Sequence, residues 1–300
     1  MIKEKLKIWV RAVRPFSFTG SVIPVALGAV LAAKQTKFQP GYFMLTIIAI
    51  VFLHAGVNLL SDHDDYANNV DTAESYGSSG VIIENLLSSK EIYKGGIICL
   101  ILGSLIGIFL SYEKGLLVLV LGLAGALGGY SYTGKPLCLK YKGLGAPLVF
   151  LLFGPLMVIG SYYVQMQSVS AAAFYISIPI GLLTTAILHA NDIRDIDYDK
   201  KACITTLSIM IGKSNSKKVY YCMLFLAYIS ILVMSFYRII PFWSVLCLIT
   251  LPTAYKNIKR LYISGDSASS LATLDKDTGQ LQAQFGIILT ISMLLPSITK

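Results

Sequence analysis

Long apolar stretches alternate with short polar ones along most of the chain. Apolar runs of about 17 to 25 residues are long enough to cross a bilayer as helices. The pattern predicts nine such spans, at roughly 17–33, 42–60, 95–111, 115–133, 144–163, 171–190, 218–236, 240–256 and 281–297. Only "SYEKG" separates the third span from the fourth and only "YRII" the seventh from the eighth, which predicts two tight hairpins. Counts of seven or eight spans remain alternatives.

Composition supports a membrane protein. Hydrophobic residues make up 55% of the chain and charged residues only 14%, with a mean hydropathy of +0.68, whereas soluble domains carry about 25% charged residues. Because the apolar runs continue along the whole length, residues 1–300 are expected to form a single integral-membrane domain. The expected fold is all-α and polytopic, with about nine transmembrane helices in a lipid bilayer around a central cavity and a cytoplasmic cap of loops and short helices.

The net charge of +9 is distributed as membrane topology requires. With the N-terminus in the cytoplasm, most lysines and arginines fall in segments on the cytoplasmic side, as the positive-inside rule predicts. The exceptions are Lys34, Lys37, Lys114, Arg238 and Lys300. The basic residues form no dense stripe with aromatic residues, which argues against nucleic-acid binding. We expect a prokaryotic cell membrane as the location, with the longer loops on the cytoplasmic side.

Cysteine and histidine patterns exclude several other classes of site. The five cysteines lie in or beside apolar stretches with no CxxC pair and no histidine at ligand spacing, so neither a zinc site nor a disulfide framework is predicted. His54 and His189 lie inside predicted spans and are expected to hydrogen-bond between helices. The basic start of the chain lacks a short apolar block with a cleavage site, which argues against a removable signal peptide.

Two acidic motifs follow predicted spans on the cytoplasmic side. "SDHDDYANNVD" follows the second span and "NDIRDIDYDKKA" the sixth, an echo that leaves an internal duplication open. At 100° per residue, one helical face carries Asn191, Asp192, Asp195 and Asp199, while Asp197 points away. In the first motif Asn58, Asp62 and Asp65 share the matching face, while Asp64 points elsewhere and Asp71 lies beyond the expected helix end.

Carboxylates this close repel one another unless a cation neutralises them. Oxygen ligands with no cysteine suit Mg²⁺, which is commonly held by a few carboxylates together with substrate phosphates. Two facing clusters would therefore bracket a diphosphate. Positive candidates for the same ligand are Lys135, Lys140, Arg194 and Lys200, and Tyr132 is a candidate wall of an apolar tunnel. For any single aspartate, the alternative is that it caps a helix end or belongs to a solvated loop.

These motifs resemble the UbiA superfamily of intramembrane prenyltransferases, whose pattern places spaced aspartates after the second and the sixth span. "VRAVRPFSFTGSVIPVALGAVLA", "GSSGVI", "YSYTGKPLCLKYKGLG" and "FLLFGPLMVIGSYYVQ" are most similar to the branch that prenylates 1,4-dihydroxy-2-naphthoate in menaquinone biosynthesis. The resemblance implies that Asp62, Asp65, Asp192 and Asp195 hold Mg²⁺ and diphosphate, with Asp71, Asp199 and Asn191 in support. Ser61 stands where the first motif usually has asparagine, and Asn58, one turn earlier, is a candidate to compensate.

The implied activity is transfer of a polyprenyl group from an allylic diphosphate to an aromatic acceptor. Other branches of the superfamily use 4-hydroxybenzoate, homogentisate, porphyrin derivatives or a glycerol phosphate lipid, and these stay alternatives. A cation-coupled transporter is a further alternative, but transport carboxylates usually lie near the middle of a span and these lie at the ends. The sequence suggests no protein partner.

Overall fold

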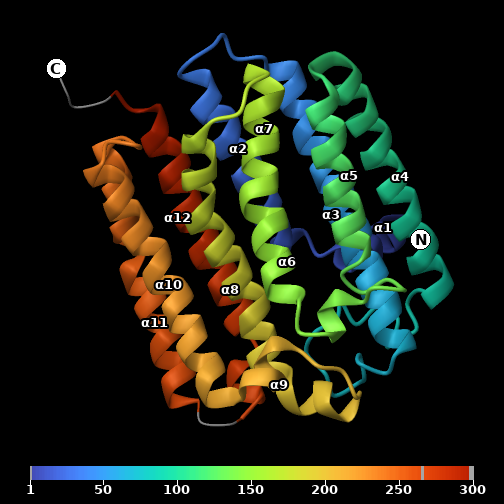
Figure 1. Ribbon diagram of the computed structural model, residues 1–300. Helices are drawn as coiled ribbons and strands as arrows, with labels where there is room; N and C mark the ends of the chain where they lie inside the picture. The colour runs from blue at the N-terminus through green and yellow to red at the C-terminus, as the bar shows by residue number, and fades with distance from the viewer. Residues whose placement is uncertain (1, 265–266, 297–300) are drawn as a thin grey trace.

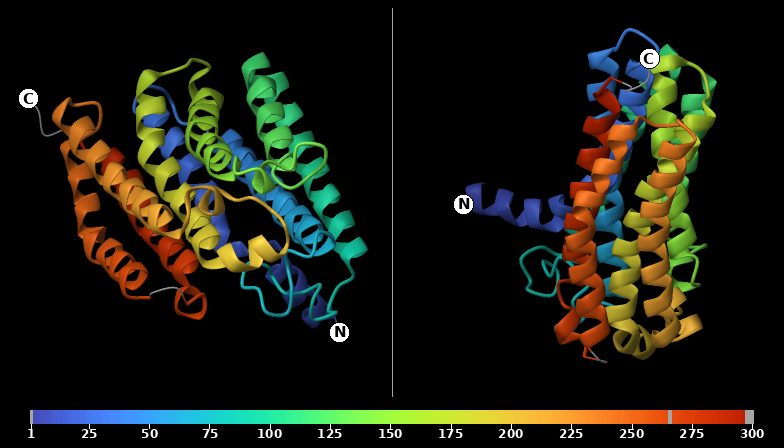
Figure 2. Two further views of the ribbon diagram at one scale, coloured as in Figure 1. Left: turned by 60° about the horizontal axis from the view of Figure 1, so that its bottom comes forward. Right: turned by 90° about the vertical axis from the view of Figure 1, so that its left-hand side faces the viewer.

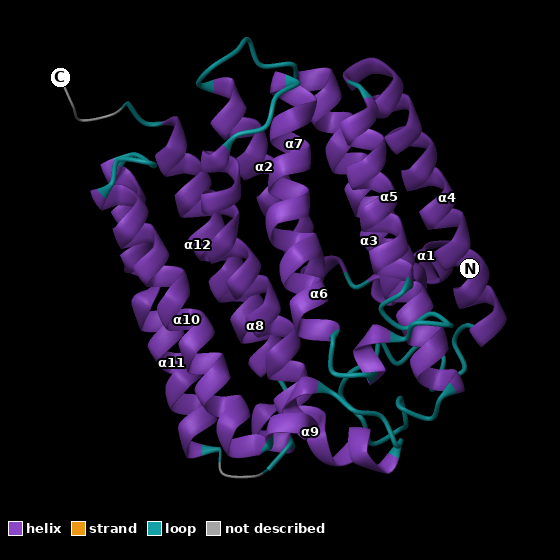
Figure 3. Cartoon of the chain, in the orientation of Figure 1, coloured by secondary structure: helices purple, strands orange, loops and turns teal. Residues whose placement is uncertain are grey.

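The computed structural model describes residues 2–264 and 267–296, and helices fill most of these ranges (Figure 1). No β-strand forms within them, as the predominantly purple cartoon of Figure 3 shows. The long helices are α2 (Thr19–Ala33), α3 (Pro40–Ala67), α4 (Ser89–Lys114), α5 (Leu116–Tyr130), α8 (Ala171–Lys201), α10 (Lys213–Phe236) and α12 (Leu274–Leu294). The prediction of an all-α polytopic protein is confirmed.

Two further long segments are built from short helical pieces. The first joins α6 (Gly145–Leu151), a π-helical turn η3 (Leu152–Leu156) and α7 (Met157–Met166), and the second joins a 3₁₀ segment η4 (Phe242–Thr250) to α11 (Leu251–Ile263). Six helical segments of the described chain are long and apolar enough to cross a membrane, and α5 is a shorter apolar helix. The count of nine therefore stays a prediction.

Both acidic motifs continue the helices that precede them. The predicted spans at 42–60 and 171–190 were expected to lead into long connections, but α3 runs on to Ala67 and α8 to Lys201. The helical placement of the two motifs is thus confirmed, and they lie at the same end of the bundle, near the loops at the bottom of Figure 1. The predicted hairpin between α4 and α5 turns at Gly115, whose φ of 105° favours glycine.

The main core lies where α2, α7, α8, α10 and α12 meet. Its fully buried side chains include Leu27, Leu183, Leu224 and Phe285. A Cβ atom on Gly28 would lie 2.3 Å from the carbonyl oxygen of Val158, so this close approach of α2 to α7 requires glycine. Outward faces of the bundle are apolar, as α4 shows with the exposed residues Ile98, Ile101 and Leu105, which suits contact with lipid.

Short elements cap the end of the bundle that carries the acidic motifs. They are α1 (Ile2–Val13), α9 (Leu207–Ile211) and the 3₁₀ turns η1 (Pro15–Phe18), η2 (Leu139–Tyr141) and η5 (Ser269–Leu271). Figure 2 shows α1 projecting at a steep angle to the long helices. Its Trp9 and Ala12 pack against a small core that includes Leu59, Val81 and Ile92, which ties the loop before α4 to the N-terminal segment.

Candidate functional site

A cavity of about 320 Å³ enters the bundle from the end that carries the acidic motifs. Apolar residues of α3, α4, α5 and α7 line its deeper part. The polar part of its lining contains six carboxylates: Asp65, Asp71, Asp192, Asp195, Asp199 and Asp275. The cavity thus combines an acidic mouth with an apolar interior, which suits a ligand with a charged head and a hydrocarbon tail.

A turn after α3 brings Asp71 back beside Asp65. The backbone N–H groups of Val70 and Asp71 both donate to the carbonyl oxygen of Asp65, at 2.8 and 3.2 Å. Burial and the neighbouring Asp65 carboxylate raise the pKa of Asp71 to about 7. Oδ2 of Asp71 is buried without a hydrogen-bond partner. A nearby cation would stabilise the charged form of this buried carboxylate, whose oxygen has no hydrogen-bond partner.

The loop between α5 and α6 supplies the groups that contact Asp65. Nζ of Lys140 lies 2.7 Å from Oδ2 of Asp65, and the hydroxyl of Tyr141 donates to Oδ1 at 2.8 Å. Burial is the largest single influence and lowers the pKa of Lys140, but Asp65 and the other acidic groups around the ammonium together raise it above its ordinary value. Ser61 also donates to Oδ2 of Asp65, at 3.2 Å. The serine that stands in place of the usual asparagine therefore orients a neighbouring carboxylate. Tyr132 lines the cavity with Lys140 5.9 Å from its ring centroid.

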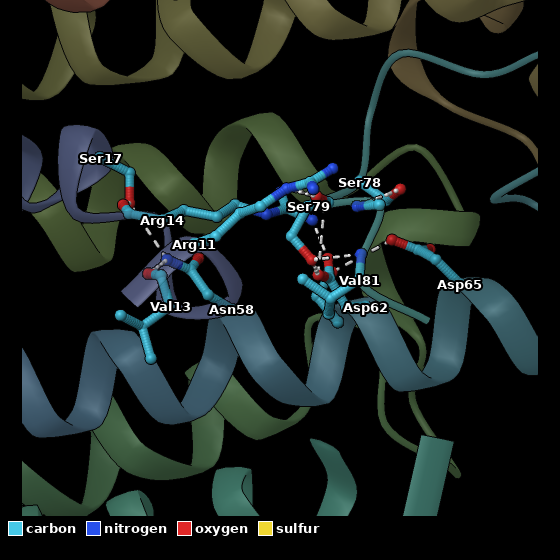
Figure 4. Close-up of polar contacts among 12 residues, drawn as sticks. Arg11, Val13, Arg14, Ser17, Asn58, Asp62, Asp65, Ser78, Ser79 and Val81 are labelled. Carbon is cyan, nitrogen blue, oxygen red and sulfur yellow. Dashed lines mark hydrogen bonds and ion pairs between the residues drawn. The ribbon is translucent and has the colours of Figure 1, made fainter. Parts of the chain in front are cut away.

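Asp62 has a different environment from the other aspartates. It is 2% exposed and lies outside the cavity lining, and it forms an ion pair with Arg14 and accepts hydrogen bonds from Ser79 (Figure 4). Arg11 in turn donates to the carbonyl oxygen of Ser79 at 2.8 Å and pairs with Glu84. The sequence pattern did not reveal Arg14 or Ser79, because basic residues near the N-terminus are also explained by membrane topology.

The second motif behaves as its helical face predicts. Asn191, Asp192, Asp195 and Asp199 of α8 all line the cavity, whereas Asp197 is exposed. Oδ1 of Asn191 is buried and has no hydrogen-bond partner. The face therefore presents three carboxylates and one free amide oxygen to the cavity.

Arg194 lies behind this face. Its Nε and Nη2 donate to the two carboxylate oxygens of Asp195 at 2.8 and 2.7 Å, and its Nη1 lies 3.3 Å from Oδ1 of Asp275 at the start of α12. The side chain is 1% exposed and lies outside the cavity lining. Arg194 thus joins α8 to α12 and positions Asp195. Asp275 was missed because nothing in "LDKDTGQ" indicates which element it faces.

The remaining predicted residues are placed as follows. Lys135 and Lys200 are exposed and lie outside the cavity lining, and Lys200 borders a separate small pocket with Asp197. Asn58 lines the cavity, and its Nδ2 donates at 3.0 Å to the carbonyl oxygen of Val13 and to Oγ of Ser17. Asn58 is therefore part of the cavity wall, while the two lysines stay predictions without a cavity contact.

The donor chemistry at the mouth fits a magnesium ion that is shared with a phosphate ligand. No group of three or more His, Cys, Asp or Glu side chains converges on one point in the described part of the chain. The mouth instead offers nearby carboxylates and the unpartnered oxygens of Asp71 and Asn191. Mg²⁺ commonly takes one or two protein carboxylates and completes its shell with substrate phosphates and water. The protein's ligands alone would leave that shell incomplete.

Comparison with known proteins shows the family to which the chain belongs. Residues 21–274 match the model of the UbiA prenyltransferase family. The chain belongs to this family. It is 28% identical over 282 residues to the 1,4-dihydroxy-2-naphthoate octaprenyltransferase of Bacillus subtilis, covering 94% of this chain and 90% of the relative. It is 30% identical over 297 residues to the human UbiA prenyltransferase domain-containing protein 1, covering 98% and 85%.

The same fold occurs in a solved structure of a UbiA homolog from Archaeoglobus fulgidus bound to DMAPP and Mg²⁺. The TM-score is 0.62 at 15% identity, and the match covers 94% of this chain and 99% of the homolog. As a UbiA family member, the chain is a membrane-bound prenyltransferase.

Proposed function

We propose that this chain transfers a polyprenyl group from an allylic diphosphate to 1,4-dihydroxy-2-naphthoate in a Mg²⁺-dependent reaction of menaquinone biosynthesis. The observation that carries the proposal is the cavity itself, in which six carboxylates stand at the mouth of an apolar interior. A prenyl diphosphate has the complementary form, because its head is anionic and its tail is a hydrocarbon. The Bacillus subtilis relative supports the naphthoate as acceptor, since its match extends over nearly the whole of both chains.

The acidic mouth binds the diphosphate in this proposal. Asp65 and Asp71 approach from the end of α3, and Asp192 and Asp195 approach from α8. Magnesium, when bound, supplies the positive charge that stabilises the departing diphosphate. Lys140 adds a further positive charge, while Asp199 and Asn191 offer supporting oxygens. Asp62 would help to hold the metal if the metal took the place of Arg14 as its counter-charge, and Arg14, which lines the cavity, would then be a candidate contact for the diphosphate.

The apolar interior protects the reaction. The allylic C–O bond breaks with its electron pair going to the diphosphate, and the electron-rich acceptor ring attacks the carbocation. The new C–C bond forms while the ring carboxylate leaves as carbon dioxide. Water would quench the carbocation, so an apolar cavity is required. The Tyr132 phenol is neutral near pH 7 at its ordinary pKa, and burial raises that pKa further, so its ring offers a neutral aromatic face to positive charge where it lines the cavity.

Orientation follows from the charges. The loops and short helices around the acidic mouth carry many of the lysines and arginines, including Arg11, Arg14, Lys135, Lys140 and Lys200. By the positive-inside rule this end faces the cytoplasm, where soluble substrates are made and pyrophosphate is released.

The test is turnover by membranes that contain this chain. Farnesyl or longer diphosphates are supplied with Mg²⁺, with and without EDTA, together with 1,4-dihydroxy-2-naphthoate, 4-hydroxybenzoate and homogentisate, and products are identified by mass. An EDTA-sensitive prenylated naphthoquinol that has lost carbon dioxide supports the proposal. A product from another acceptor alone refutes the naphthoate assignment, and no product from folded protein with any acceptor refutes the proposed reaction.

A further inference from the structure

A second polar cluster lies deeper in the same cavity, away from the carboxylates. His54 of α3 precedes Asp62 by eight residues, or ~12 Å along an α-helix. It is 9% exposed and lines the cavity, as do Ser17 and Asn58. His54 of α3 bonds to Ser21 of α2, so the expected hydrogen bond between helices is present, but that bond does not explain why the ring also lines the cavity. None of the steps proposed above uses this histidine.

The hydrogen bonds around His54 define which ring nitrogen carries the proton. Oγ of Ser17 donates to the carbonyl oxygen of Arg14 at 2.9 Å and accepts from Nδ2 of Asn58 at 3.0 Å, two groups that Figure 4 shows close together. Because the Ser17 proton is already used, Nε2 of His54, 3.3 Å away, must be the donor to Ser17. Nδ1 is then the acceptor, and Ser21 donates to it at 2.6 Å.

The two nitrogens of His54 have unequal bonds. Ser21 is fully buried outside the cavity lining, so the short bond at Nδ1 anchors the ring from behind. The bond from Nε2 to Ser17 is longer than the usual 2.9 to 3.0 Å and lies at the cavity wall. The Nε2–H group is therefore a fixed donor that is available to a better acceptor, such as a phenolate or carboxylate oxygen.

An aromatic side chain stands beside this donor. The ring of Phe153 lies 5.0 Å from that of His54 in an edge-on arrangement, and it lines the cavity. Phe153 belongs to the π-helical turn η3, where Pro155 has no N–H to donate. Such π-helical turns are rare and often occur at functional sites, because they displace one residue from the regular helical register.

The cavity lining separates into two chemical surfaces. The surface from η1, α3 and η3 carries Ser17, His54, Asn58 and Phe153, which suits a planar ring with oxygen substituents. The surface from α4 and α5 carries Gly103, Gly107, Gly122 and Gly125 among aliphatic residues, and it offers no polar partner that would recognise such a ring. A flexible hydrocarbon fits this second surface.

We propose that His54 binds the aromatic acceptor, donating its Nε2–H to a ring oxygen while the ring packs against Phe153. This inference rests on the proposed function, because it requires an aromatic acceptor. It does not require that the acceptor be the naphthoate, since any ring that bears a hydroxyl or carboxylate offers the same oxygen.

Two substitutions of His54 separate acceptor binding from a structural role. The amide nitrogen of glutamine can occupy roughly the place of Nε2, and the amide oxygen of asparagine can occupy roughly the place of Nδ1, where it accepts from Ser21. His54→Gln therefore keeps a hydrogen-bond donor toward the cavity. His54→Asn loses that donor and keeps only the hydrogen bond with Ser21. We expect His54→Asn to raise the KM for the acceptor by about tenfold or more, as expected for a lost hydrogen bond to a charged oxygen. His54→Gln should stay within about threefold of the wild-type KM, and the KM for the prenyl diphosphate should change in neither variant.

His189 provides the matched control. It is fully buried in α8, bonds to the carbonyl oxygen of Ser216 at 3.0 Å and lies outside the cavity lining. His189→Asn should leave the KM for the acceptor unchanged. The inference is overturned if His54→Asn and His54→Gln have equal effects, if glutamine is worse, or if the KM for the prenyl diphosphate rises in parallel.

The wild-type enzyme distinguishes failure of this inference from failure of the proposed function. If it prenylates a different aromatic acid, the naphthoate assignment fails and the same variants are compared with that acid. If it prenylates only a non-aromatic acceptor, both proposals are refuted. If it prenylates the naphthoate and the variants do not separate as expected, only the role of His54 is refuted.

Discussion

Nζ of Lys140 lies 2.7 Å from Oδ2 of Asp65, and this ion pair fastens the loop between α5 and α6 to the end of α3. The side chain of Lys140 is 17% exposed and that of Asp65 is 5% exposed, so the pair is shielded from solvent. Shielding makes such a pair sensitive to the loss of one partner, since the remaining charge is left without compensation. The same lysine lies among the carboxylates at the cavity mouth, where the diphosphate is proposed to bind.

Replacing Lys140 should therefore impair binding of the diphosphate. We expect Lys140→Met to raise the KM for the prenyl diphosphate by about tenfold or more, because one charge-assisted contact is lost and the carboxylates are left less compensated. Lys142 is an exposed lysine of the same loop, and Lys142→Met should retain the wild-type KM. Steady-state kinetics at saturating acceptor measure both values, and equal KM values for the two variants would exclude a diphosphate contact by Lys140.

The second acidic motif contains its own control. Asp192 lines the cavity, while Asp197, five residues later, is exposed on the opposite side of α8. Asp192→Asn should lower kcat by about 10²- to 10³-fold, the range for loss of one electrostatic contact in an active site. Asp197→Asn should keep full activity. Both proteins should unfold thermally like the wild type, and full turnover by Asp192→Asn in Mg²⁺ would refute the metal and diphosphate assignment for this residue.

Helical periodicity predicted the parts of this site that lie on one helix. Asn191, Asp192, Asp195 and Asp199 share a face of α8 because residues three, four and seven apart lie on the same side, and the exposed Asp197 follows from the same rule. The apolar runs predicted most of the membrane segments for a comparable reason, since crossing a bilayer requires a minimum length.

Contacts between distant segments were not predictable in this way. Arg14 reaches Asp62 across 48 positions of the chain, and Asp275 reaches Arg194 from the start of α12. A single sequence shows that these side chains are charged but does not show which helices become neighbours. For the same reason, the sequence did not show that Arg194 lies outside the cavity lining, between Asp195 and Asp275, and its contact with a diphosphate stays a prediction.

The ion pair between Arg14 and Asp62 predicts a stability that depends on the metal. Arg14→Gln leaves the nearly buried Asp62 carboxylate without its counter-charge, which we expect to lower the thermal midpoint in EDTA by about 5 °C or more. Added Mg²⁺ should recover most of that loss if the metal replaces the guanidinium on Asp62. The measurement is thermal unfolding in detergent with EDTA or Mg²⁺.

Arg11 is the control for this experiment. It pairs with Glu84, but both side chains are about half exposed, at 46% and 49%. Exposed pairs contribute little because water screens them, so Arg11→Gln should shift the midpoint by about 2 °C or less with no dependence on Mg²⁺. A Mg²⁺ response that is the same in Arg14→Gln and Arg11→Gln would rule out Asp62 as the residue that exchanges Arg14 for metal.

Glycines of α4 and α5 predict how the enzyme selects the length of its prenyl donor. A Cβ atom on Gly107 or Gly122 would meet no other atom within 4 Å, and both residues line the cavity. A leucine at position 122 would occupy open space between the helices while favouring the helical backbone. We expect Gly122→Leu to lower kcat/KM for long prenyl diphosphates by about tenfold or more relative to farnesyl diphosphate, the effect of steric overpacking in a filled channel.

Gly41, at the start of α3, is the control for this substitution. A Cβ atom there would also meet no other atom within 4 Å, but Gly41 lies outside the cavity lining. Gly41→Leu should leave the preference for donor length unchanged, which separates filling of the cavity from a general effect of adding a leucine to a membrane helix. Competition between farnesyl and longer diphosphates, with products resolved by mass, measures the preference directly. If Gly122→Leu reduced turnover of both donors equally, the surface from α4 and α5 would not hold the distal part of the tail, and the long donor would have to leave the cavity between other helices.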